Sequence, residues 1–272
     1  MMTSFVPDTG RLALVMLAAI VGGAVNAIAG GGTLLTFPAL VGLGIPPIVA
    51  NATSTVALWP GAVASMWGYR DLLSGMRGWV IRFAIPSLLG GLLGAVLLLV
   101  TPARRFDEIV PWLVFGATLL FLVQRPLSER LSQRAERHAS VPDVTDDHDF
   151  DRAVQPSGRL LAYQFGVAVY GGYFGAGIGI LMLAALGFMG FRNIHRMNGL
   201  KNWGGLCANA VAAGTFAVSG LVSWPVAIAM AIGAAAGGYG GSRLAQRVPQ
   251  ARVRQAIVVI GFAATLWLLT RT

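Results

Sequence analysis

The chain has 272 residues, of which 56% are hydrophobic and 11% charged, whereas about a quarter of the residues of ordinary soluble proteins are charged. The formal net charge is +9, and residues 160–272 contain seven Arg, one Lys and no acidic residue. This composition argues against a soluble enzyme and a secreted domain. It also argues against a nucleic-acid-binding protein, because the basic residues stand singly in short loops between apolar runs, as in membrane proteins. The lone cysteine, Cys207, cannot form an internal disulfide.

Apolar stretches of about 20 residues predict membrane-spanning helices. In chain order they lie at roughly 11–29, 48–69, 79–100, 107–123, 160–174, 197–218, 224–242 and 251–270. Two further stretches, 33–43 and 178–190, are too short to span, and each follows a glycine cluster. The clusters are Gly30, Gly31 and Gly32 in the first half, and Gly175, Gly177 and Gly179 in the second. Because clustered glycines disfavour helix, each half is predicted to begin with a helix, a break and a short helix.

Residues 124–159 form a long polar segment with six Arg and seven acidic residues. We predict a cytoplasmic linker here, between a first membrane repeat (1–123) and a second (160–272). The acidic residues from Asp143 to Asp151, with His148, are more typical of a solvated loop than of a metal site. Residues 27–29 also resemble a signal-peptidase site. We expect the first helix to be retained, because the same helix–glycine pattern recurs inside the chain.

The two halves overlay when the chain is shifted by 146 residues, which places Gly31 on Gly177 and Leu40 on Leu186. The Lys and Arg residues, however, change places between equivalent loops. Residues 70–82 are basic, whereas the equivalent residues 219–223 contain no Lys or Arg. Residues 243–254 are also basic, and the equivalent loop 101–106 contains two Arg. Residues 190–196 are basic, and the equivalent 44–47 are not. Under the positive-inside rule this pattern predicts two inverted-topology repeats, with both termini on the outer face.

The predicted fold is therefore an all-α polytopic membrane protein. Each repeat contains a glycine-broken helix hairpin, either re-entrant or of two tilted spans, and three spanning helices. Hydropathy gives eight spans, and we expect about ten helical segments. Irregular backbone at membrane depth is tolerated only where protein or a water-filled cavity satisfies it, so equivalent breaks indicate a binding site between the repeats. Helix N-termini that follow the breaks suit an anion, although glycines can also serve only close packing.

Polar residues inside apolar runs complete the candidate site. Lys201 is the only lysine, it lies inside a predicted span, and residues after Asp151 offer no carboxylate to pair with it. A substrate anion could pair with it, and snorkelling to the interface is the alternative. The candidate substrate-binding residues are Asn26, Gly30, Gly31, Gly32, Thr33, Asn51, Thr53, Ser54, Thr55, Gly175, Gly177, Gly179, Asn198, Lys201 and Asn202.

Residue types that are missing narrow the function further. No acidic residue lies deep in a predicted span, which disfavours coupling through a buried carboxylate. The sequence has no phosphate-binding loop, no HExxH motif and no catalytic triad pattern, so we expect no enzyme, no metal and no cofactor.

The segment NAIAGGGTLLTFPALVGLGIPPIVANATST (26–55) resembles the signature of the TauE/SafE sulfite exporter family, and GGYFGAGIGILMLAALGF (171–188) resembles its weaker second copy. The resemblance covers nearly the whole chain outside the linker. It implies two repeats and transport of small sulfur-containing or carboxylate anions. Ala176 and Ile178 interrupt the second glycine cluster, which leaves the two half-sites chemically unequal.

Together these observations predict a secondary transporter in the bacterial inner membrane, most simply an exporter of sulfite, sulfoacetate or another organosulfonate. Its expected partners are the small anion and the lipid bilayer, with no nucleic acid, and a homodimer is one assembly that the sequence leaves open. The alternatives are an uptake permease for a small anion and a non-transporting anchor subunit. Deletion of the linker distinguishes a transporter from an anchor subunit. A transporter should still transport its substrate, whereas an anchor should no longer bind its partner protein.

Overall fold

The structure is a computed structural model that describes residues 9–137, 156–188, 194–244 and 250–271. The described residues form ten α-helices and one short 3₁₀ helix, and they contain no strand. The helices are α1 (Thr9–Ala29), α2 (Thr33–Gly42), α3 (Pro47–Tyr69), α4 (Arg77–Val100), α5 (Ala103–Arg137), α7 (Gly158–Tyr173), α8 (Ile178–Phe188), α9 (Ile194–Val218), α10 (Trp224–Leu244) and α11 (Gln250–Leu269), with η1 at Arg70–Leu73. The all-helical class and the ten helical segments predicted from the sequence are confirmed within this part of the chain.

Three of the described helices are long and apolar enough to cross a membrane by themselves, at Thr9–Ile28, Arg77–Val100 and Ala103–Val123. Two of the remaining long helices, α3 and α9, are less apolar for a visible reason. The run from Asn51 to Thr55 lowers the hydropathy of α3, and Lys201 and Asn202 lower that of α9. The residues that weaken the hydropathy signal are thus the same residues that were predicted to bind substrate.

Helices of one half pack mainly on helices of the other half. α1 lies along α10, and α7, its counterpart in the second half, lies along α4. In the same exchanged manner α3 packs on α10 while α9 packs on α4, and α3 and α9 contact each other. The glycines predicted for close packing are found at these crossings. Gly94 meets the backbone of Val169, and Gly237 meets the backbone of Ile20.

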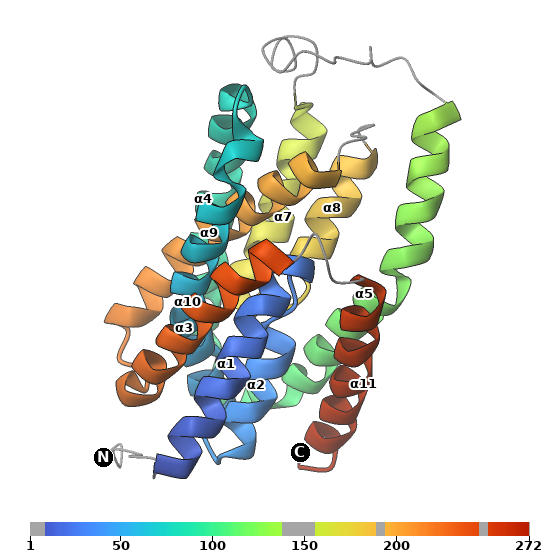
Figure 1. The fold of residues 1–272 in the computed structure, drawn as a ribbon. Helices are drawn as coiled ribbons and strands as arrows, with labels where there is room; N and C mark the ends of the chain where they lie inside the picture. Colours follow the sequence, from blue (N-terminus) through green and yellow to red (C-terminus); the bar gives the residue numbers. More distant parts are fainter. Residues whose placement is uncertain (1–8, 138–155, 189–193, 245–249, 272) are drawn as a thin grey trace.

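The two glycine-broken helix pairs approach each other from opposite ends of the bundle (Figure 1). In that view α1 rises from the end that carries both termini and α2 returns to it, whereas α7 descends from the other end and α8 returns there. α2 has 10 residues and α8 has 11, so each is about 15 Å long, half of the roughly 30 Å hydrocarbon core. Both short helices therefore have the length of re-entrant segments.

Helix α5 is longer than predicted. Its 35 residues reach Arg137, so the first part of the segment expected to be a linker continues the helix. The sequence from Ser128 to Arg137 is rich in Leu, Glu, Gln and Arg, which are good helix formers even where the chain is polar. The acidic cluster around His148 lies outside the described residues.

Prolines interrupt four helices of the first half, at Pro38 in α2, Pro60 in α3, Pro86 in α4, and Pro111 and Pro126 in α5. A proline has no N–H, so the carbonyl four residues earlier lacks its helical donor. The helices α7, α8, α9 and α11 contain no proline. The two halves thus share their helix order but differ in backbone continuity.

Candidate substrate site at the two glycine breaks

The first break follows α1. Gly30 has a φ of 80°, a left-handed conformation that glycine adopts without strain, and its amide donates to the carbonyls of Val25 and Asn26 at 3.2 and 3.0 Å. Helix α2 then starts with Gly32 as its N-cap residue, and no side chain caps it. The amides of Leu34, Leu35 and Thr36 donate to the carbonyls of Gly31 and Gly32 at 3.0–3.1 Å, so this uncapped start presents its partial positive charge at the amides before Leu34.

The second break has the same design with different residues. Gly175 and Gly177 have φ values of 83° and 80°, and the amide of Gly175 donates to the carbonyl of Tyr170 at 3.2 Å. The Tyr170 hydroxyl donates to the carbonyl of Ala176 at 2.8 Å, which fixes the loop between the two glycines. The first break has no counterpart to this phenol, so the two breaks are chemically unequal.

The two breaks touch each other. A Cβ atom at Gly30 would lie 2.9 Å from the Cα of Gly179, so the backbones meet without an intervening side chain. Helix α5 covers both breaks, with Phe121 against Gly31 and Ala117 against Gly177. The six glycines predicted from the two clusters therefore form one continuous region, although about 146 residues separate equivalent positions.

Lys201 lies against the end of α1 at the first break. Its side chain is 2% exposed, and Nζ donates to the carbonyls of Ala27 and Ile28 at 3.5 Å each. Carbonyls in the last turn of a helix carry partial negative charge, which stabilises a cation. Among the described residues no carboxylate forms a salt bridge with Lys201. The ammonium is thus held by dipoles alone and faces the break rather than the protein surface.

Asn51 has the corresponding place at the second break. Its Nδ2 donates to the carbonyl of Tyr173 at 2.9 Å, in the last residue of α7. Tyr173 stands 146 residues after Ala27, so the two acceptors are equivalent in the repeat. A side chain of α9 therefore caps α1, and a side chain of α3 caps α7. One cap is a cation and the other is a neutral amide.

Thr33 and Asn209 meet at Gly175. A Cβ atom at Gly175 would lie 3.8 Å from both the Thr33 Oγ1 and the Asn209 Oδ1. The Asn209 Nδ2 donates to the carbonyl of Gly205 in its own helix at 2.9 Å, which holds the amide in place. The sequence analysis missed Asn209. The available signal was an amide inside the apolar stretch 197–218.

Two buried hydroxyls connect α2 to α3. The Oγ atoms of Thr36 and Ser54 lie 2.6 Å apart, and the Thr36 hydroxyl donates to the carbonyl of Gly32 at 3.2 Å. Ser54 thus reaches the first break through Thr36. Asn26 lies on the other side of the same glycine, because a Cβ atom at Gly32 would be 3.1 Å from the Asn26 Cβ.

The two threonines next to Ser54 have other partners. The Thr53 Oγ1 accepts a hydrogen bond from the amide of Ser223 at 3.1 Å, just before α10 begins. The Thr55 hydroxyl donates to the carbonyl of Asn51 in its own helix at 2.9 Å. In this structure, therefore, the Thr53 hydroxyl contacts the loop before α10 and not a glycine break.

Several buried amide atoms of α3 and α9 have no hydrogen-bond partner within the described residues. They are the Oδ1 atoms of Asn51 and Asn198 and the Nδ2 atom of Asn202. Buried polar atoms are almost always paired in folded proteins, so unpaired ones mark places where a ligand or water belongs. One turn of α9 therefore contains the Lys201 ammonium and, next to it, the Asn202 amide nitrogen, a donor without a hydrogen-bond partner among the described residues.

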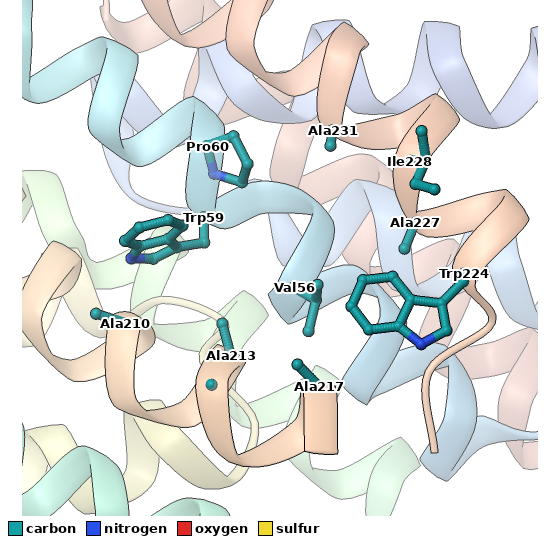
Figure 2. A pocket seen from close by; sticks show the side chains of 11 residues that line it. Val56, Trp59, Pro60, Ala210, Ala213, Ala217, Trp224, Ala227, Ile228 and Ala231 are labelled. Atoms are coloured by element: carbon teal, nitrogen blue, oxygen red, sulfur yellow. The ribbon is translucent and has the colours of Figure 1, made fainter. Parts of the chain in front are cut away.

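A separate cavity of about 390 Å³ lies between α3, α9 and α10 (Figure 2). Its walls include Val56, Trp59, Ala213, Trp224 and Ile228, and none of its lining residues is charged. The Trp59 indole N–H, which has no hydrogen-bond partner in the described chain, is its notable polar group. Such apolar walls do not fit a small anion, so the glycine breaks are the better candidate despite this cavity. The described residues also contain no cluster of side chains able to hold a metal ion.

The fold and the site thus define a polytopic helical membrane protein with two contacting helix breaks. Residues 15–268 match the model of the sulfite exporter TauE/SafE family, and the chain belongs to that family. The resemblance noted in the sequence is therefore confirmed over most of the chain.

Curated relatives carry consistent names. A probable membrane transporter protein of Haemophilus influenzae is 27% identical over 93% of this chain and 92% of its own length. A probable membrane transporter protein of Escherichia coli K12, YfcA, is 28% identical over 95% of this chain and 89% of its own length. No solved structure matches the chain significantly. The family and these names indicate a membrane transporter rather than an enzyme.

Proposed function

We propose that this protein is a secondary transporter that exports small sulfur-containing anions, such as sulfite, sulfoacetate or another organosulfonate, across the bacterial inner membrane. The carrying observation is the buried Lys201, which faces the break between α1 and α2 and forms no salt bridge with a described carboxylate. A buried cation is unfavourable in a membrane protein unless something compensates it, and a substrate anion does so during transport.

The anion binds between the two breaks. The ammonium of Lys201 supplies the charge, and the starts of α2 and α8 supply partial positive charge and the N–H groups that precede Leu34 and Ile180. Thr33 and Asn202 are placed to bind further substrate atoms, because Thr33 lies beside Gly175 and the Asn202 amide has an unpaired nitrogen. The site therefore recognises oxygen atoms of the substrate with several donors and one full charge.

Alternating access follows from an inverted repeat. In this proposal residues 70–77, 124–159, 190–196 and 243–251 are cytoplasmic and both termini are outside. The exchanged helix contacts between the halves support such a relationship, as does the approach of the two broken pairs from opposite ends (Figure 1). Opening one side and then the other requires the two halves to slide at the shared α3–α9 contact.

The membrane potential provides the driving force. Moving one negative charge out of a negative interior is favourable by about 2.3 kcal/mol per 100 mV. Efflux of an anion therefore needs no buried carboxylate for ion coupling.

Inside-out vesicles that contain the full chain test the proposal directly. With a lumen-positive potential imposed, a labelled organosulfonate should accumulate in the lumen, and vesicles with Lys201→Met should accumulate no more than empty vesicles. Accumulation that is independent of the potential would contradict electrogenic export. Binding without any transport would favour a non-transporting role.

A further inference from the structure

The charge of the proposed site can be counted from the groups that surround the two breaks. The described segments at the breaks, 26–33, 51–55, 117–121, 173–179 and 198–209, contain one ionisable cation, Lys201, and no acidic residue. Arg196 stands five positions earlier on α9 and is half-exposed. On α5, Asp107 stands ten positions before Ala117, about 15 Å along the helix.

The helix ends at the breaks add no net charge. The C-termini of α1 and α7 each carry about half a negative charge, and the N-termini of α2 and α8 each carry about half a positive charge. All four ends meet in one region, because Gly30 contacts Gly179. The dipole contributions therefore cancel to first order, and the net charge of the region is the single positive charge of Lys201.

Because the Asn51 amide is neutral, the net charge of the region stays at one positive charge. This amide caps α7 at the place where Lys201 caps α1, but it carries no charge. A second cation at the equivalent cap would have given the site a charge of +2. The two caps therefore set the total charge that a bound anion has to balance.

We infer that the site selects anions with one net negative charge and discriminates against dianions. This inference rests on the proposed transport function and narrows its substrate class to monovalent organosulfonates and bisulfite, which removes sulfoacetate and the sulfite dianion from the candidate substrates named above. A monoanion forms a neutral assembly with the Lys201 ammonium. A dianion leaves one uncompensated charge among buried groups, which is strongly unfavourable where little water is present.

A matched pair of two-carbon sulfonates tests the inference. Isethionate carries one negative charge, and sulfoacetate has the same carbon count with a carboxylate in place of the hydroxymethyl group, so it carries two. The purified full-length protein is titrated with each anion, and thermal stabilisation is measured, because a ligand of the folded state raises the apparent stability. Transport of both is then measured in reconstituted vesicles.

We expect isethionate to bind at least tenfold more tightly than sulfoacetate, and to be transported at lower concentration. Equal or tighter binding of sulfoacetate would overturn the charge inference while leaving the proposed function intact. If neither anion binds or is transported, the proposed function fails for organosulfonates and the inference fails with it. Because the test compares the binding of two anions to the wild-type protein, its outcome does not depend on whether a variant folds.

A variant adds a second readout. Lys201→Gln removes the positive charge and keeps a hydrogen-bond donor. It should weaken isethionate binding at least tenfold, because the monoanion then leaves its own charge uncompensated, and it should weaken sulfoacetate binding at least as much. Unchanged isethionate binding in a folded Lys201→Gln protein would show that the Lys201 charge does not balance the bound anion, and would overturn the inference.

Discussion

The ammonium nitrogen of Lys201 lies 3.5 Å from the carbonyl oxygen of Ala27, although 174 residues separate them in the chain. This contact joins a helix of the second half to the first glycine break. It gives the buried cation a favourable position at a helix C-terminus without neutralising its charge. The cation therefore remains available to a bound anion.

Replacement of Lys201 by Met should abolish anion binding and leave the fold intact. Methionine keeps the apolar stem, and loss of the contact with the end of α1 removes about 0.3–2 kcal/mol of helix-end stabilisation, which the removal of a buried charge offsets. Thermal melting and anion titration of the purified variant check both parts. Arg196→Gln is the matched control, since it removes a cation from the same helix outside the breaks. Normal anion binding by Lys201→Met would contradict the role of the lysine.

Alanine at Gly30 should destabilise the protein more than alanine at Gly44. Both residues have left-handed φ values, 80° and 89°, so both substitutions introduce a backbone penalty of about 1–2 kcal/mol. At Gly44 a Cβ atom meets nothing within 4 Å, whereas at Gly30 it would lie 2.9 Å from the Cα of Gly179. The difference between the two melting temperatures isolates the contact between the breaks. Equal shifts would mean that the breaks can separate freely.

Substitution of Asn51 by Asp should lower stability and anion binding together. The Nδ2 donor to Tyr173 is lost, and a buried negative charge then faces the negative end of α7, so we expect a loss of roughly 3 kcal/mol. Thr55→Val is the control one turn later. Its hydroxyl bonds only to its own helix, and its removal should change stability by less than about 1 kcal/mol. Chemical or thermal denaturation of both proteins measures the difference, and similar losses would rule out a special role of the Asn51 cap.

Cysteines at two equivalent turns should show opposite sidedness. Ser74 and Ser219 occupy matching positions in the two halves, and the proposed inverted repeat would place Ser74 inside the cell and Ser219 outside. In a Cys207→Ala background, a membrane-impermeant maleimide added to intact cells should label Ser219→Cys and not Ser74→Cys. Lysis should make both reactive. Labelling of both cysteines in intact cells, or of neither, would contradict the inverted arrangement.

The helices and the breaks could be predicted from the sequence because their causes are local. Apolar length marks the spans, and clustered glycines end α1 and α7 near the predicted positions. The end of α5 was predicted too early, because polar residues were equated with a linker although residues 128–137 favour helix.

The hydrogen-bond partners of the site residues could not be predicted from the sequence. The Lys201–Ala27 and Asn51–Tyr173 contacts depend on how distant helices pack, and hydropathy carries no information about such pairs. For the same reason Thr53 was grouped with Ser54, although its hydroxyl contacts Ser223. Asn209 was missed because a single amide in an apolar helix is common and often bonds only to neighbouring backbone.

Because the prolines are unequally distributed, the two halves differ in where their helices can bend. Leu34, Val56, Arg82 and Asp107 each precede a helix proline by four residues, so α2, α3, α4 and α5 each contain a backbone position where bending breaks no helical hydrogen bond. The proline-free α7, α8 and α9 lack such joints. We therefore expect that any change of shape during transport bends helices of the first half more than α7, α8 and α9 of the half that carries Lys201.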